Sequence, residues 1–95
     1  MKQILLVANP TAQSGRNAAR IGRALALLRA RGVEAHVLPT EPGGRTSRAV
    51  HDALISGSFG CVVSMGGDGT FREVAEGLLE SGRAEEVPLG MLPST

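Results

Sequence analysis

Aromatic residues are almost absent from this sequence, which has two Phe, no Tyr and no Trp in 95 residues. Proteins that bind single-stranded nucleic acid usually stack bases on aromatic rings, so this class of function is nearly excluded. An excess of charge is also lacking, because ten Lys and Arg face nine Asp and Glu, for a formal net charge of +1. This balance gives no electrostatic case for a nucleic-acid partner.

Cysteine and long apolar runs are scarce as well. The single cysteine excludes an internal disulfide and any CxxC metal or redox motif. No uninterrupted apolar run is longer than that of Ile4 to Ala8, which is far too short to span a bilayer or to form the core of a signal peptide. With 42% hydrophobic residues the chain can still build a globular core. We therefore expect one cytoplasmic domain, or part of one.

Short apolar runs alternate with amphipathic segments along the chain. The run Ile4 to Ala8 is apolar on both faces, as in a buried strand, and Ile21, Leu25 and Leu28 recur at helical spacing. A strand–helix unit repeated three times and closed by a strand predicts an α/β fold, an open parallel sheet with helical crossovers. The patterns predict strands at 4–8, 33–38, 61–65 and 89–92, and helices at 16–30, from a Thr46 or Ser47 cap to about Ile55, and from Thr70 to a stop at Gly82.

The residues after the last predicted strand, 93–95, come with no helix to cover it. A sheet of four strands and three helices is small, and one face or edge would be left poorly covered. We therefore interpret residues 1–95 as the front part of a longer protein.

Small polar residues and glycines follow each predicted strand. They are Asn9-Pro10, residues 40–44, residues 66–70 and residues 93–95. Because the carboxyl ends of parallel strands share one edge, these loops gather where ligands of open α/β sheets bind. Glycines let backbone amides approach a ligand closely, and helix N-termini add positive potential. The mixture suits a phosphate-bearing ligand.

The usual phosphate motifs are missing. The only lysine is Lys2, so there is no P-loop lysine, and no GxGxxG follows the first strand. Backbone amides, arginines and Mg²⁺ would then have to neutralise phosphate charge. Asp68 is the residue we expect to organise the metal, directly or through water.

Residues 66–70, Gly-Gly-Asp-Gly-Thr, resemble the signature of the diacylglycerol kinase catalytic-domain family, which includes sphingosine kinases and YegS-like lipid kinases. Asn9-Pro10 followed by Gly15 resembles the first-strand motif of that family. Thr40, Glu73 and residues 89–93 also fall where the family has a threonine, an acid, and a strand with its proline. The resemblance therefore covers nearly the whole chain.

The resemblance implies the three-layer N-terminal domain shared with NAD kinases and phosphofructokinases, here truncated. It implies a lipid kinase that moves the γ-phosphate of ATP to a lipid hydroxyl with Mg²⁺, Asp68 acting in catalysis and metal binding. A β-rich C-terminal domain, absent from this chain, would bind the lipid, supply the general base and make any peripheral contact with the inner membrane surface. The nucleotide-binding residues it implies are Asn9, Thr40, Gly66, Gly67, Asp68, Gly69, Thr70, Arg72 and Glu73.

Two positions depart from the family pattern. Arg72 stands where the family usually has Asn, and Thr95 either replaces a glycine or follows a one-residue deletion, so we assign it no role. Local structure also explains part of the motif. Residues 66–69 suit a tight turn, and Thr70-x-x-Glu73 matches a helix capping box.

Other functions fit the same residues. A kinase for NAD or a sugar phosphate would keep phosphoryl transfer and change the acceptor, although Asn9-Pro10 and Thr40 resemble the lipid kinases. A nucleotide-binding module without catalysis of its own is a third interpretation. A phosphoreceiver domain is disfavoured, because it expects acidic residues directly after the first strand.

Overall fold

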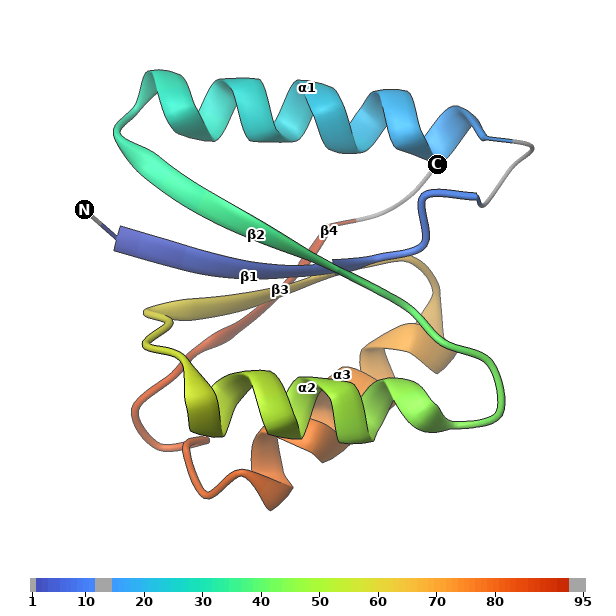
Figure 1. Cartoon of the computed structure of the whole chain (residues 1–95), viewed down its shortest axis with the longest axis vertical. Helices are drawn as coiled ribbons and strands as arrows, with labels where there is room; N and C mark the ends of the chain where they lie inside the picture. Colours follow the sequence, from blue (N-terminus) through green and yellow to red (C-terminus); the bar gives the residue numbers. More distant parts are fainter. Residues whose placement is uncertain (1, 12–14, 93–95) are drawn as a thin grey trace.

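The computed structural model describes residues 2–11 and 15–92 and has one layer of strands between two layers of helices (Figure 1). The elements are β1 (Lys2–Ala8), α1 (Arg16–Ala30), β2 (Val33–Pro39), α2 (Arg45–Ser56), β3 (Cys61–Met65), α3 (Asp68–Glu80) and β4 (Leu89–Leu92). The predicted order of strands and helices is confirmed. Within these described residues, no helix has the length and hydropathy needed to cross a membrane.

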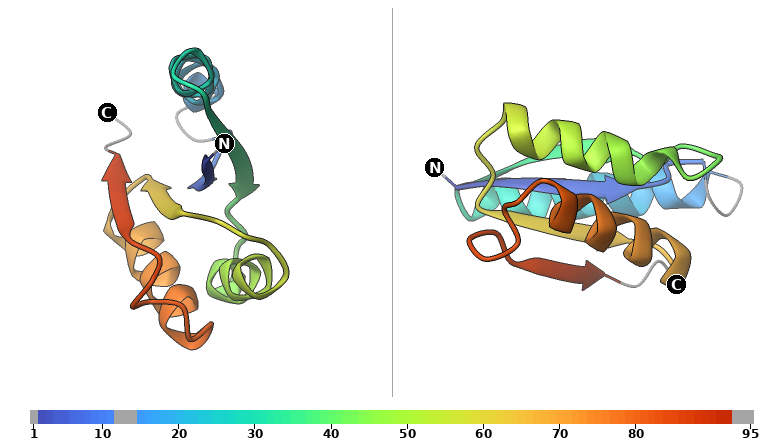
Figure 2. Two further views of the ribbon diagram at one scale, coloured as in Figure 1. Left: turned by 90° about the vertical axis from the view of Figure 1, so that its left-hand side faces the viewer. Right: turned by 90° about the horizontal axis from the view of Figure 1, so that it is seen from below.

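The four strands form one parallel sheet in the order β2-β1-β3-β4. In register, Leu6 of β1 lies between Val37 of β2 and Val63 of β3. Parallel crossovers are right-handed, so the helix face changes when the direction of strand addition changes after β2. Accordingly, α1 lies on one face and α2 and α3 lie on the other (Figure 2). The three-layer open α/β fold expected from the sequence is confirmed.

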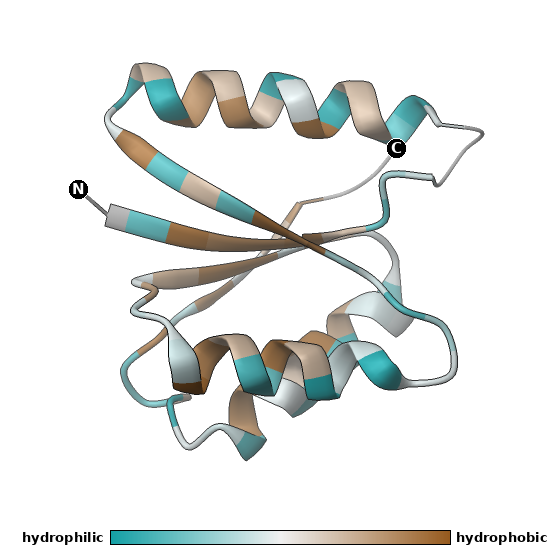
Figure 3. Cartoon of the chain, viewed as in Figure 1, coloured by the Kyte–Doolittle hydropathy of each residue, from teal (hydrophilic) through white to brown (hydrophobic). Residues whose placement is uncertain are grey.

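Both faces of β1 are buried, as its continuous apolar run predicts. Leu5 and Val7 pack into the larger core under α2 and α3, where Val50, Leu54 and Val74 are also buried. The smaller core under α1 contains Leu6, Ala8, Ile21 and Met65. In Figure 3, β1 is brown along most of its length, whereas β2 alternates between brown and teal, in agreement with its alternating burial.

Two predicted helix starts are wrong. Helix α2 begins after Gly44, whose left-handed backbone (φ 76°) reverses the chain, and neither Thr46 nor Ser47 caps it. Helix α3 begins at Asp68 after Gly67, two residues earlier than predicted. The α3 N-cap makes no side-chain hydrogen bond, so Thr70 and Glu73 do not form the predicted capping box. In both helices a glycine backbone turns the chain into the helix without a side-chain cap.

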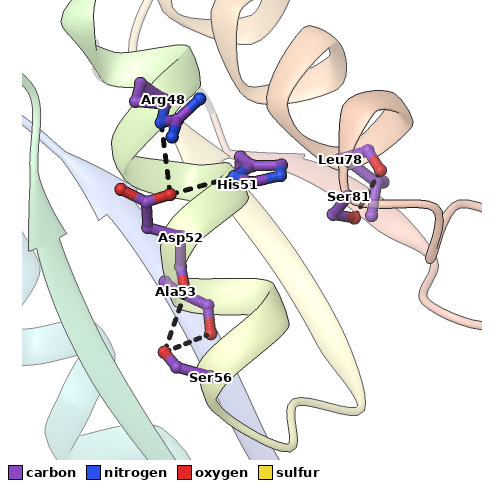
Figure 4. Close-up of polar contacts among 7 residues, drawn as sticks. All are labelled: Arg48, His51, Asp52, Ala53, Ser56, Leu78 and Ser81. Carbon is purple, nitrogen blue, oxygen red and sulfur yellow. Dashed lines mark hydrogen bonds and ion pairs between the residues drawn. The ribbon is translucent and has the colours of Figure 1, made fainter.

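Figure 4 shows polar side chains that form hydrogen bonds near the C-terminal ends of α2 and α3 or lie on an exposed face of α2. The Ser56 hydroxyl donates to the carbonyl of Asp52 at 2.8 Å, and the Ser81 hydroxyl donates to the carbonyl of Leu78 at 2.6 Å. The Ser81 bond satisfies a carbonyl that the end of α3 leaves without a helical partner, whereas the Asp52 carbonyl lies just before the last four carbonyls of α2. Asp52 also contacts His51 Nδ1 at 2.9 Å. The contact between these two neighbouring residues stabilises α2 locally.

A segment missed in the sequence links α3 to β4. Val87 is 2% exposed and belongs to the larger core, although no periodic pattern marks it. Arg83 donates from Nη1 to the Leu54 carbonyl at 2.9 Å and forms an ion pair with Glu86. The guanidinium thereby ties the C-terminal end of α2 to the chain after α3.

Helices α2 and α3 are in close contact at Gly77. A Cβ atom at this position would overlap the carbonyl oxygen of Ser47 and lie 2.8 Å from Cβ of Val50. Gly77 is buried, and the atoms it faces include α2 backbone, which cannot move aside as a flexible side chain could. The absence of a side chain here therefore sets the distance between the two helices.

We predict that Gly77→Ala lowers the free energy of unfolding by about 1–3 kcal/mol, because the added methyl group overpacks the α2–α3 contact. Gly22→Ala is the matched control, since Gly22 is an exposed α1 residue at which an added Cβ would meet no atom within 4 Å. The control should raise the free energy of unfolding by about 0.5–1 kcal/mol through helix propensity. Urea unfolding measures both, and equal effects would contradict the close-packing argument.

Candidate functional site

The candidate site lies at the carboxyl edge of the sheet, on the right in Figure 1. All three helices begin at this edge because every crossover in a parallel sheet starts there. Their N-caps are Gly15, Gly44 and Gly67, and within the described residues none makes a side-chain capping bond. Each helix therefore directs the positive end of its dipole and free amides toward the same edge. The arrangement favours an anionic ligand.

The first turn of α3 is the richest source of free amides. The helical ladder starts with Phe71, whose amide donates to the Gly67 carbonyl at 3.1 Å. The amides of Gly67 to Thr70 therefore have no helical acceptor. Added Cβ atoms at Gly67 and Gly69 would meet nothing within 4 Å, so this backbone borders open space. The segment predicted as a glycine loop is a helix N-terminus that can accept a phosphate group.

Gly66 lies between β3 and the first turn of α3, close to the side chain of Thr70. Its amide donates to the Leu92 carbonyl at 3.4 Å, which continues the β3–β4 pairing. A Cβ at Gly66 would lie 3.2 Å from Oγ1 of Thr70, and the residue has φ +158°. A side chain here would push Thr70 away from the strand. Gly66 therefore sets the position of Thr70.

A polar pocket of about 370 Å³ opens beside α3. The structure brings four of the predicted nucleotide-binding residues into its wall from three separate strand ends. The predicted members are Asn9, Thr40, Thr70 and Glu73, joined by Thr11, Glu41, Pro42 and Thr46.

The β2–α2 side of this pocket is held by Thr46. Its side chain is buried at 1% exposure, and Oγ1 accepts from the Glu41 amide at 2.9 Å and donates to the Glu41 carbonyl at 3.2 Å. The preceding amide, of Thr40, donates to the Ala8 carbonyl of β1 at 3.1 Å. These bonds fix Thr40 beside the end of β1.

Thr46 is thus a site residue that the sequence analysis assigned to the wrong task. A threonine near the start of a helix signals a cap, and only the fold of the preceding loop shows that its hydroxyl bonds backward to Glu41. Thr11 was missed, and Glu41 was placed at the ligand edge with residues 40–44 but was given no role of its own.

Asn9 has a structural task in the wall of the pocket. Its Oδ1 accepts from the Thr11 amide at 3.0 Å and from the Thr11 hydroxyl at 2.7 Å. Its carbonyl accepts from Nδ2 of Asn17, a buried α1 residue, at 2.7 Å. The Asn9-Pro10 motif therefore closes a turn and connects the end of β1 to the first turn of α1.

Glu73 is the half-buried acid of the pocket. One carboxylate oxygen, Oε1, is buried and has no hydrogen-bond partner within the described residues. A buried acceptor without a donor costs free energy, so this oxygen is suited to a ligand that donates a hydrogen bond. With Glu41 also in the wall, the pocket suits hydroxyl or amino groups better than phosphate.

Asp68 and Arg72 lie elsewhere. They line a shallow surface on another side of α3, together with Phe71, Ala75, Glu76 and Leu79. Both side chains are exposed, and the helical turn separates them from Thr70 and Glu73. The structure therefore divides the predicted α3 residues between two surfaces that meet at the free amides.

Within the described residues, no group of three or more His, Cys, Asp or Glu is arranged to hold a metal ion. Asp68 can still supply one carboxylate to Mg²⁺, which proteins often bind through one or two carboxylates with waters and substrate phosphates completing the shell. Its place on the first turn of α3, beside the free amides, fits that use. Pro93 and Thr95, which the family resemblance also involves, lie outside the described residues.

Known proteins resemble most of this chain. It is 38% identical over 79 residues to a protein of Klebsiella pneumoniae (strain 342) named as a probable YegS-like lipid kinase, covering 83% of this chain and 26% of the relative. A protein of the same name from Enterobacter sp. (strain 638) is 39% identical over 70 residues, covering 74% of this chain and 23% of the relative. The chain thus spans about a quarter of the length of these curated relatives.

A solved structure of a putative diacylglycerol kinase from Bacillus anthracis str. Sterne superposes with a TM-score of 0.69 at 26% identity. The match covers 97% of this chain and 30% of that one. The family model for the diacylglycerol kinase catalytic domain matches residues 3–94. The chain therefore belongs to the diacylglycerol kinase catalytic-domain family, of which it carries the α/β layers with the Gly66–Thr70 signature.

Proposed function

We propose that residues 1–95 form the ATP-binding part of a lipid kinase that transfers the γ-phosphate of ATP to the hydroxyl of a diacylglycerol-like lipid. The observation that carries the proposal is the convergence of free α3 amides, Thr40, Thr70 and Glu73 at one sheet edge in a member of this kinase family. A nucleotide has both an anionic end and a hydroxyl-rich end, and this edge offers complementary groups for each.

The amides of Gly67 to Thr70 are the proposed phosphate contacts. They combine unpaired donors with the positive end of the α3 dipole, which stabilises phosphate oxygens without a lysine. Asp68 would hold Mg²⁺ on the outer side of this turn, where the ion, when bound, neutralises charge on the transferring phosphoryl group. Arg72, exposed on the same surface, can contact phosphate oxygens directly.

The polar pocket is the proposed place for the ribose. The free Oε1 atom of Glu73 can accept a hydrogen bond from a ribose hydroxyl, as acidic residues do in dinucleotide-binding α/β folds. Thr40 and Thr70 line the same pocket and add hydroxyl groups. In this arrangement the nucleotide lies across the start of α3, with its sugar over the pocket and its phosphates over the amides.

The general base and the lipid site would come from the rest of the protein, since this chain spans about a quarter of its curated relatives. The 95-residue chain alone should then bind nucleotide without transferring phosphate. We propose a cytoplasmic enzyme whose peripheral contact with the membrane is made by that remaining part.

We predict that the complete gene product transfers label from [γ-³²P]ATP to a lipid in the presence of Mg²⁺. The assay would supply mixed bacterial lipids, NAD and fructose 6-phosphate together and partition the products into organic and aqueous phases. Label in the organic phase supports the proposal. Label confined to NAD or the sugar would assign the other acceptor, and binding of ATP with no transfer to any acceptor would indicate a non-catalytic module.

We predict that Asp68→Asn in the complete protein lowers kcat by about 100-fold or more, because the variant loses the charge that holds Mg²⁺ near the phosphates. The fold should be retained, since the Asp68 side chain is exposed. Glu80→Gln, an exposed change at the other end of α3, is the matched control and should leave kcat unchanged. An Asp68→Asn enzyme with normal turnover would remove this residue from the mechanism.

We predict that Glu73→Gln weakens ATP binding by about 10- to 100-fold, the usual cost of losing one charged hydrogen bond. The loss should be much smaller with 2′-deoxy-ATP or 3′-deoxy-ATP, whichever lacks the hydroxyl that Glu73 binds. Glu80→Gln, at the far end of α3 and outside both surfaces, controls for a general change of charge. Calorimetric titration measures the affinities, and an equal loss with all three nucleotides would show that Glu73 does not contact the ribose.

A further inference from the structure

The two faces of the sheet are covered unequally. Two helices, α2 and α3, lie on one face of the four strands, whereas within the described residues only α1 lies on the other (Figure 2). Neighbouring strands are about 4.8 Å apart and packed helices about 8–10 Å apart, so four strands need two helices on each face. The face that carries α1 is therefore half covered, and the open width matches one helix.

The uncovered half is an apolar groove of about 370 Å³ between α1, β3 and β4. Its walls include Leu27, 60% exposed, Met91, 46% exposed, and Leu92, 41% exposed. Three large apolar side chains that border one groove are unusual on a solvent-facing surface and indicate that another element covers it. Ile4, Leu6 and Val63 also line the groove, so the sheet itself is part of what is left open.

Charge along α1 indicates what kind of segment fits. Arg20 lies one and two turns before Ala24 and Leu27, which line the groove, and so faces the same side of the helix. Its Nη1 atom is buried and lacks a hydrogen-bond partner in the part of the chain that the structure describes. Residues 16–30 contain no Asp or Glu. An acidic residue on the covering element would therefore be favoured beside Arg20, because α1 carries four arginines and no acid.

We propose that a helix from the remainder of the gene product, outside residues 1–95, fills this groove. The helix would pack an apolar stripe against β3 and β4 and would place an acidic residue toward Arg20. The curated relatives and the B. anthracis structure are more than three times as long as the region matched. Leu92, the last residue of β4, is itself part of the wall, so the polypeptide leaves the sheet beside the groove. This inference concerns folding and assembly, and it stands whether or not the proposed lipid kinase activity is correct.

The test compares two single-cysteine variants of the complete protein. Both carry Cys61→Ser, so that the introduced cysteine replaces the native one of this region. Leu27→Cys reports on the groove, and Ile55→Cys on α2 is the control, because the two side chains are 60% and 59% exposed in this structure. Maleimide labelling rates are measured in the native protein and divided by the rates in urea. We expect the Leu27→Cys ratio to be at least about tenfold lower than the Ile55→Cys ratio, as for a site reached only through local opening.

Equal ratios would overturn the proposal, because the groove would then be open in the complete protein. Protection of Leu27→Cys that disappears on dilution would assign the groove to a second copy of the chain, and protection seen only with lipid vesicles would assign it to a bilayer surface. A photocrosslinking residue at position 27 identifies the covering segment directly. We expect a crosslinked peptide from beyond residue 95 within a monomeric band, whereas a crosslinked dimer would contradict the proposal.

Discussion

Burial of β1 between β2 and β3 is the constraint on which the rest of the structure depends. Its buried residues, Leu5 to Ala8, are apolar on both faces, and the strand pairs in parallel with a strand on each side. Parallel pairing obliges each connection to cross the sheet through a helix and to start again at the same edge. Three helix N-termini therefore meet at that edge, and none is capped by a side chain in the described residues. The suitability of this edge for an anionic ligand follows from the topology of the sheet.

The α3 residues that the family resemblance implies for nucleotide binding lie on two different surfaces of the helix. Thr70 and Glu73 face the polar pocket with Thr40, whereas Asp68 and Arg72 face outward on another side of the helix. The amides between them belong to both surfaces. A contiguous sequence motif can thus serve a sugar and a charged phosphate–metal group at once, because about 100° of rotation per residue distributes neighbouring side chains around the helix.

The same sheet leaves one face incomplete. Its α2–α3 face is closed by a contact so close that Gly77 has no room for a methyl group, while the α1 face keeps an apolar groove beside β4. Tight packing on one side and an open groove on the other fit a unit that belongs to a larger fold. The chain, about a quarter of the length of its curated relatives, carries the nucleotide side of the proposed kinase and the surface on which another part can rest.

The sequence by itself determined the elements and their order, because hydrophobic periodicity is a local property. The bounds of α1, β3 and β4 agree with prediction, and Gly82 follows the end of α3 where expected. The helix starts at Asp68 and Arg45 were not predicted, since glycine backbones, rather than the nearby threonines, turn the chain there. Only the tertiary structure decided which site residues meet, because sheet order and helix rotation depend on contacts between segments far apart in the chain.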